Sequence, residues 1–295
     1  MVYFRFHGYH TVTRDNLKTL THLILACTLL FSALIAQAES FKLGITSATA
    51  RGQYALLEEW RDYLQIKLDH PVEFVFRDSY LELLDLMKQK KLDFAWVSSP
   101  AYLENEQKMS LLVTPVYKGH PFDHAYLIVP ATDQRTQSLF NLKNKVFAYV
   151  DPDSSTGYLD PKHQLKLAGK NPERFFKKAF FTRDEQKVVA AVAIGLADAG
   201  SMSGFAWDTL ALSRPDITAQ TRVVSKSAAY GFPPVIVRNT LSQTDSRKMQ
   251  RVLLDMKNDV DGLKLLQRLN IEGFILADKK LYEGVQRMMI HMGDL

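Results

Sequence analysis

One short stretch of the sequence concentrates hydroxyl groups at a bend. In "DPDSSTGYLDP" (151–161), Ser154, Ser155 and Thr156 follow one another directly before a glycine and an aromatic residue. Asp, Pro, Ser and Gly each favour turns, so turn chemistry and a helix N-cap explain part of this composition. Hydroxyls at a helix N-terminus can also join free backbone amides in holding an anion. The stretch therefore predicts an oxyanion site, and a ligand-free N-cap with a turn is the alternative.

Two similar series of strands and helices surround this bend. The first series comprises strands over 41–45, 72–76 and 92–97, a helix from about 54 to 68, and a helix over 80–87 that ends in lysines. The second comprises strands over 145–150 and 178–181, and helices from about 156 to 168 and 185 to 196. This alternation predicts an α/β protein with two lobes, each a mostly parallel sheet flanked by helices.

The two series also match residue by residue near their ends. An aspartate, Asp93 or Asp198, is followed five residues later by a serine, Ser98 or Ser203, and then by an alanine and an aromatic residue at the same offsets. Ligands of open parallel sheets bind beyond the carboxyl ends of the strands. Both serines are therefore expected to face a cleft between the lobes.

The C-terminal part returns to the first lobe. A strand over 232–238 precedes helices from about 242 to 257 and 261 to 269, and a final amphipathic helix. Two crossings between the lobes are expected near 129–132 and 223–233. The predicted first lobe is 39–129 with 232–295, and the second lobe is 130–231.

The N-terminus has the pattern of a secretory signal. Arg14 and Lys18 precede a mostly apolar run over 23–36, and a small-x-small triplet ends at Ala38. The run is shorter than the ~20 residues that span a bilayer. We expect residues 1–38 to form a signal peptide that is cleaved on export to the periplasm. A lipoprotein anchored at Cys27 is the weaker alternative, because the apolar run continues well beyond that cysteine.

Composition excludes several classes of function. The formal charge is +5, and removing a leader with three cations and one anion leaves +3, too mild for nucleic-acid binding without a Lys/Arg stripe. A mature chain that begins at Glu39 has no cysteine, hence no disulfide or thiolate site. "AGSMSG" does not satisfy Gly-x-Ser-x-Gly, and no Ser-His-Asp set is visible. We therefore expect a binding protein, and an enzyme on the same fold is the less favoured alternative.

Most of the mature chain resembles the phosphonate-transporter substrate-binding (PhnD-like) family of periplasmic proteins. The resemblance runs from "FKLGITSATARG" through "RDSYLELLDLMKQKKLDFAWVSSPAYL" and "LADAGSMSGFAW" to "GFPPVIVRNTLS". Its most specific motif is "DPDSSTGYLDP", close to the family's Asp-Pro-x-Ser-x-Ser-Gly-Tyr-Leu-x-Pro. The resemblance implies the type II two-lobed fold with two hinge crossings. It also implies oxyanion binding by Ser154, Ser155 and Thr156, and a place for Tyr80 on the cleft wall.

The sequence departs from the family pattern at three places, one of which is "GFPPV" near the second crossing, where the family has an acid suited to a ligand amine. "FTRDEQKVV" carries Arg183 and Asp184 where the family has a His-Asp or His-Glu pair, and Asp123-His124 replace a tyrosine ahead of the "LIV" strand. Arg183 is a candidate ligand contact because a guanidinium suits oxyanions, and a surface ion pair is its alternative. A metal site at His120, Asp123 and His124 is weakly indicated, since the spacing is not a recognised one, so neither metal nor cofactor is expected.

Together these patterns predict a monomer that captures a small oxyanion, such as phosphonate, phosphate or a related anion, for a membrane ABC importer. A periplasmic sensor that reports the solute to a membrane histidine kinase is the alternative. The predicted ligand-binding residues are Tyr80, Ser98, Ser99, His124, Ser154, Ser155, Thr156, Gly157, Arg183 and Ser203.

Overall fold

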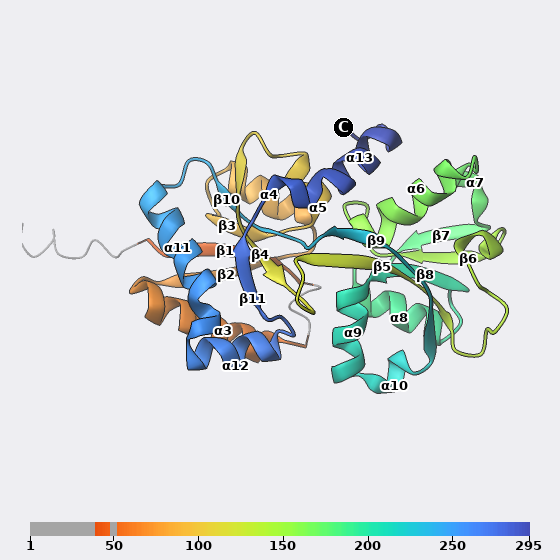
Figure 1. Cartoon of the computed structure of the whole chain (residues 1–295), viewed down its shortest axis with the longest axis horizontal. Coiled ribbons are helices and arrows are strands. Elements are labelled where there is room, and N and C mark those ends of the chain that lie inside the picture. The colour runs from red at the N-terminus through yellow and green to blue at the C-terminus, as the bar shows by residue number, and fades with distance from the viewer. Residues whose placement is uncertain (1–38, 48–51) are drawn as a thin grey trace, which may run out of the picture. The chain divides into compact units, whose positions relative to one another are not determined.

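Two β-sheets with helices on both faces organise the chain (Figure 1). The computed structural model describes residues 39–47 and 52–295, so the predicted signal peptide and Cys27 lie outside the described residues. Ser40–Leu295 forms one compact unit. No helix in the described ranges is both long enough and apolar enough to cross a membrane.

The first lobe is built on a six-stranded sheet. In spatial order its strands are β11 (Gly273–Leu276), β4 (Met109–Val116), β10 (Val235–Arg238), β3 (Phe94–Trp96), β1 (Phe41–Thr46) and β2 (Val72–Arg77). Its helices are α3 (Tyr54–Leu68), α4 (Tyr80–Lys88), α5 (Ser99–Leu103), α11 (Gln243–Asp255), η3 (Met256–Asn258), α12 (Val260–Arg268), η4 (Lys279–Tyr282) and α13 (Glu283–Met292).

The second lobe is built on a five-stranded sheet. In spatial order its strands are β7 (Lys178–Phe181), β6 (Val146–Tyr149), β8 (Ala199–Ser203), β5 (Phe122–Pro130) and β9 (Thr221–Gly231). Its helices are η1 (Leu139–Leu142), η2 (Ser155–Leu159), α6 (Asp160–Leu167), α7 (Pro172–Phe175), α8 (Glu185–Ala193), α9 (Gly204–Ser213) and α10 (Pro215–Thr218).

The predicted two-lobed α/β architecture is confirmed, but the sheets are mixed rather than mostly parallel. β1 runs parallel to β2 and β3, whereas β10, β4 and β11 pair in antiparallel fashion. In the second sheet β6 runs parallel to β7 and β8, whereas β5 is antiparallel to β8 and β9. β5 and β10, the first strands after the two crossings, run antiparallel to both of their neighbours, because the chain arrives from the other lobe and not through a βαβ unit.

The first crossing lies earlier in the chain than the sequence predicts. β5 pairs with β8 and β9, so residues 125–129 belong to the second sheet, although they are predicted in the first lobe. The chain therefore leaves the first sheet after β4, through residues 117–121, and returns between β9 and β10 at 232–234. Residues 125–129 of β5 are all apolar and buried, so the composition of this run does not reveal which sheet holds it.

Each sheet separates two hydrophobic clusters through side-chain alternation. In β10, Val235 and Val237 lie in one cluster of the first lobe, while Ile236 between them lies in the other. The latter cluster also includes Leu159 of η2 and Tyr230 of β9, which come from the second lobe. The buried apolar surface is therefore continuous across the lobes at that point.

Local sequence explains most helix positions. α3 spans 54–68 as predicted and ends where Asp69 takes a left-handed conformation with φ 48°. The helix predicted from about 156 to 168 instead begins as the π-helical turn η2, which continues directly into α6. The wide turn arises at the hydroxyl-rich bend, where the Leu159 amide donates to the Ser154 carbonyl oxygen at 3.0 Å.

Candidate ligand-binding site

The hydroxyl-rich bend lies beyond the carboxyl end of β6, where it begins η2. Ser154 is the N-cap, and its Oγ accepts a hydrogen bond from the Gly157 amide at 2.9 Å. A Cβ at Gly157 would lie 2.4 Å from Cγ2 of Val150, so only glycine fits there without a shift of the buried valine. The Ser154 hydroxyl is therefore committed to the cap, as the ligand-free alternative predicts.

The next two hydroxyls have no such role. Ser155 is 6% exposed and Thr156 is 5% exposed, yet neither hydroxyl makes a hydrogen bond within the part of the chain that the structure describes. The Thr156 carbonyl oxygen does accept from Ser201 Oγ at 2.7 Å, which ties η2 to β8. Neither oxygen is among the fully buried side-chain atoms without a partner in the described residues, so both hydroxyls reach open space and are available to an incoming acceptor.

The internal repeat has a structural basis. Asp93 Oδ2 accepts from the Lys42 amide at 2.9 Å, and Asp198 Oδ2 accepts from the Val146 amide at 2.7 Å. Each aspartate precedes the third strand of its series and holds the start of the first strand. The two aspartates therefore occupy corresponding positions in the two lobes.

The serines of the repeat are both helix N-caps. Ser98 Oγ accepts from the Ala101 amide at 3.3 Å at the start of α5, and Ser203 Oγ accepts from the Ala206 amide at 3.1 Å at the start of α9. Ser99, by contrast, is fully buried and donates its hydroxyl to the Gly231 carbonyl oxygen at 3.1 Å. Ser99 thus fastens α5 to the end of β9.

Tyr80 and Glu185 are the first residues of α4 and α8, after the N-caps Ser79 and Asp184. Both side chains are half-buried. Burial raises the pKa of the Tyr80 phenol, and the carboxylates of Glu185, Asp151 and Asp153 raise it further. The Tyr80 hydroxyl of the first lobe therefore lies close to acidic groups of the second.

Two of the second lobe's carboxyl groups meet at Ser203. Asp123 is 5% exposed and accepts from Ser203 Oγ at 2.6 Å and from the Phe205 amide at 3.0 Å. Glu185 Oε2 accepts from the Ser203 amide at 3.1 Å. Burial, with the nearby carboxylates of Asp123 and Asp184, raises the pKa of Glu185 to about 8. Glu185 is therefore mostly protonated at neutral pH.

Arg183 already has an anionic partner. Its Nη1 lies 2.7 Å from Asp151 Oδ2, and its backbone takes a left-handed conformation with φ 58°. Its side chain is 53% exposed, as the surface-pair alternative predicts. Nearby, burial and the charges of Asp151 and Glu104 raise the pKa of Asp153 to about 6. The site thus has more carboxyl groups than cations to balance them.

His124 contacts backbone rather than open space. Its Nδ1 lies 2.9 Å from the Ser227 carbonyl oxygen, which fixes the proton on that nitrogen. Over residues 39–47 and 52–295, no group of three or more His, Cys, Asp or Glu side chains has an arrangement suited to a metal ion.

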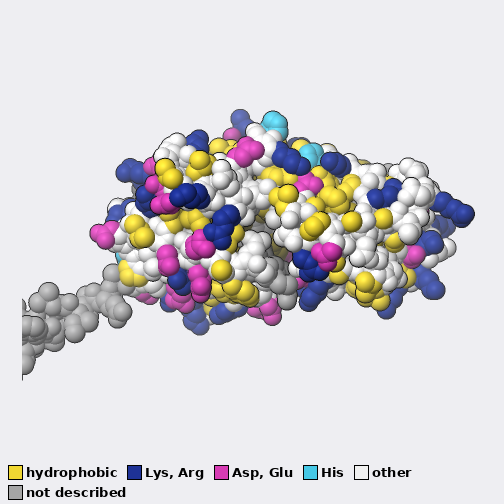
Figure 2. All heavy atoms as spheres, turned by 90° about the horizontal axis from the view of Figure 1, so that it is seen from below, with side chains coloured by type: hydrophobic (Ala, Val, Ile, Leu, Met, Phe, Trp, Pro, Cys, Tyr) yellow, Lys and Arg dark blue, Asp and Glu magenta, His cyan; other side chains and the backbone are white. Residues whose placement is uncertain are grey.

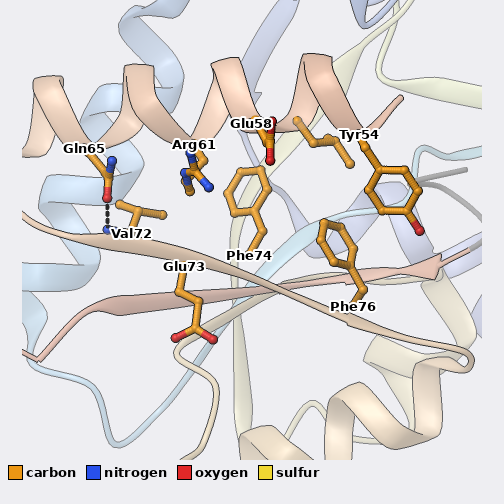
Figure 3. A pocket seen from close by; sticks show the side chains of 9 residues that line it. Tyr54, Glu58, Arg61, Gln65, Val72, Glu73, Phe74 and Phe76 are labelled. Carbon is orange, nitrogen blue, oxygen red and sulfur yellow. Dashed lines mark hydrogen bonds between the residues drawn. The ribbon is translucent and has the colours of Figure 1, made fainter. Parts of the chain in front are cut away.

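A separate groove of about 420 Å³ lies between α3 and the edge strand β2 (Figure 3). Phe74 and Phe76 of β2 point toward α3, and Gln65 accepts from the Val72 amide at 3.1 Å. That contact covers part of the open strand edge. None of the predicted ligand-binding residues lines this groove. On the face shown in Figure 2, Lys and Arg side chains are interspersed with Asp and Glu.

The fold and the donor-rich bend between the two sheets define a type II two-lobed binding protein. The chain belongs to the ABC transporter phosphonate periplasmic substrate-binding protein family, whose model matches residues 43–282. The phosphonates-binding periplasmic protein of Escherichia coli is 25% identical over 243 residues, 79% of this chain and 71% of that protein.

Solved structures show the same fold. A binding protein component of an ABC phosphonate transporter from Pseudomonas aeruginosa has a TM-score of 0.78 at 22% identity, covering 86% of each chain. PhnD1 from Prochlorococcus marinus, in complex with methylphosphonate, has a TM-score of 0.76 at 19% identity, covering 87% of this chain and 99% of that one. The match of the family model to residues 43–282 confirms the predicted family.

The acidic residues of the site are those that sequence reasoning missed. Glu185 is absent from the predicted set, although it precedes Asp198 by 13 residues, the same interval that separates Tyr80 from Asp93. Extending the repeat backward by this interval would have paired Glu185 with Tyr80. The positions of Asp151 and Asp153 beside Tyr80 have no comparable signal in the sequence.

Proposed function

We propose that this protein captures a small oxyanion, of the phosphonate, phosphate or phosphite class, between its lobes and presents it to an ABC permease. The observation that carries the proposal is the pair of accessible hydroxyls without partners on Ser155 and Thr156, at the start of a helical segment that runs through α6. The first amides of such a segment have no acceptor within it.

The chemistry of the bend suits an anion without a dedicated cation. Arg183 is paired with Asp151, so hydroxyls, helix amides and the Tyr80 phenol supply the donors. Hydrogen bonds to a charged acceptor are roughly twice as strong as those between neutral groups. Neutral donors that a fold holds in place therefore suffice to bind a small anion.

Family membership favours transport over sensing, because the family consists of ABC transporter components. We further propose that the chain acts as a monomer in the periplasm after cleavage behind Ala38, and that it does not convert its ligand. Intact mass and light scattering of the exported protein, and a search for product after incubation with phosphonates, test these points.

The central experiment removes the two available hydroxyls together. Ser155→Ala with Thr156→Val should weaken binding of the best oxyanion about a hundredfold or more, since each hydrogen bond to a charged group contributes about 1.5–3 kcal/mol. The double variant should stay folded, because neither hydroxyl bonds to the rest of the protein. Titration calorimetry with methylphosphonate, phosphate and phosphite measures the loss.

Ser242→Ala is the matched control. Ser242 caps α11 by accepting from the Asp245 amide at 3.1 Å, away from the bend. Its loss should lower stability by about 1 kcal/mol without changing affinity. An affinity of the double variant within threefold of wild type would mean that the bend is a cap and a turn.

A further inference from the structure

Tyr80 and Glu185 occupy corresponding places in the two lobes. Each is the first residue of the helix that follows the second strand of its series, β2 or β7, and each precedes the repeat aspartate by 13 residues. The carboxyl group of Glu185 is near enough to the Tyr80 phenol to act on its ionisation. No hydrogen bond joins them among the described residues. The two side chains thus come from opposite lobes and lie near enough to interact electrostatically.

Only one oxygen of Glu185 has a partner. Oε2 accepts from the Ser203 amide at 3.1 Å, and Oε1 makes no hydrogen bond within the described ranges. The groups around it are Asp123 of β5, its neighbour Asp184, and Tyr80 of α4. No ion pair to Glu185 forms in that part of the chain; the nearby Arg183 is bound to Asp151. A half-buried carboxyl group among acidic neighbours is most stable when it keeps its proton.

Glu185 and the hydroxyl-rich bend are anchored to the same end of β8. The Thr156 carbonyl oxygen accepts from Ser201 Oγ, and Glu185 Oε2 accepts from the amide of Ser203, two residues further along the strand. This shared anchor brings Glu185 to the end of β8 at which the oxyanion is proposed to bind.

Building on the proposed function, we propose that Glu185 is a specificity-determining residue that binds as a neutral carboxylic acid, donating a hydrogen bond from Oε1 to the bound oxyanion opposite Tyr80. Once ionised, the same group repels the ligand. The proton on Glu185 thus decides whether the second lobe accepts or rejects an anion.

Methylphosphonate binding by wild type and Glu185→Gln, measured calorimetrically between pH 6.5 and 9, tests this role. The amide mimics the neutral acid as a donor but cannot ionise. The ligand's own ionisation affects both proteins equally, so the ratio of their affinities isolates Glu185. The ratio should be near one at pH 6.5. At pH 9 the variant should bind about tenfold tighter, because a group with a pKa of about 8 is then mostly ionised.

A ratio that stays constant with pH, or a variant that loses binding at every pH, would overturn the role of Glu185 while leaving oxyanion binding intact. If neither protein binds methylphosphonate, phosphate or phosphite at pH 6.5, the proposed function itself is wrong. Glu58→Gln, on the exposed side of α3, is the control and should follow wild type. The ¹³C shift of the Glu185 carboxyl in the bound protein gives a second readout, and a carboxylate at pH 6.5 would refute the proposal.

Discussion

The two lobes share one plan of strands but differ in what their cleft edges carry. The order β2-β1-β3-β10 in the first sheet corresponds to β7-β6-β8-β5 in the second, with an aspartate and a capping serine at matching places. In the first lobe Asp93 pairs with Arg238, and Ser98 only caps its helix. In the second lobe Ser203 also binds Asp123 and Glu185. The repeat aspartates and serines make the same contacts to backbone amides in both lobes, but the charged groups around them differ.

The largest expected contrast lies between the two aspartates. Asp93 Oδ1 accepts from Arg238 Nη2 at 2.7 Å, and these side chains are 12% and 16% exposed. Asp93→Ala should cost about 3 kcal/mol or more, because it leaves a nearly buried guanidinium unpaired. Asp198→Ala should cost about 1 kcal/mol, since its partner Lys145 lies 3.8 Å away and both are exposed. Urea unfolding of both variants measures the difference, and equal losses would show that the Arg238 pair adds nothing to the shared backbone contact.

A smaller contrast separates the two capping serines. Ser98→Ala removes one cap and should lower the free energy of unfolding by about 1 kcal/mol. Ser203→Ala removes a cap and also the hydroxyl that donates to buried Asp123 at 2.6 Å, so a loss of about 2 kcal/mol is expected. Thermal unfolding at pH 7 compares them. A Ser203 variant no less stable than the Ser98 variant would mean that the Asp123 contact contributes nothing.

A third prediction concerns how stability depends on pH without ligand. Folding raises the pKa of Glu185 to about 8, so the native state holds a proton that the unfolded chain releases above about pH 4.5. Stability should therefore fall as the pH rises from about 5 to 8. Glu185→Gln removes this contribution, so its advantage over wild type should grow across that range, by up to about 1.4 kcal/mol per pH unit. Tyr80→Phe should show no such trend, because burial holds the phenol protonated there. Melting temperatures of wild type and both variants at pH 5 and 8 test this pH dependence.

Features set by interactions between neighbouring residues could be predicted from the sequence, whereas features set by contacts between distant segments could not. Helix α3 and strand β7 have the predicted bounds, because hydrophobic spacing and end signals are local. The membership of β5 in the second sheet is a pairing between distant segments, which an apolar run does not encode. The hydroxyl-rich bend could be found from residue types alone. The raised pKa of Glu185 could not, since it follows mainly from burial and then from Asp123, which only the fold brings near.

The shared hydrophobic cluster has a mechanical consequence. Leu159, at the end of η2, is buried with side chains of the first lobe such as Met288, although η2 belongs to the second. When one lobe turns against the other, points anchored in both move least. Ser155 and Thr156, about one helical turn from Leu159, are therefore expected to move little in such a turn. We expect an entering anion to meet a half-site that is already assembled, and the swing of the far wall to set how long it stays.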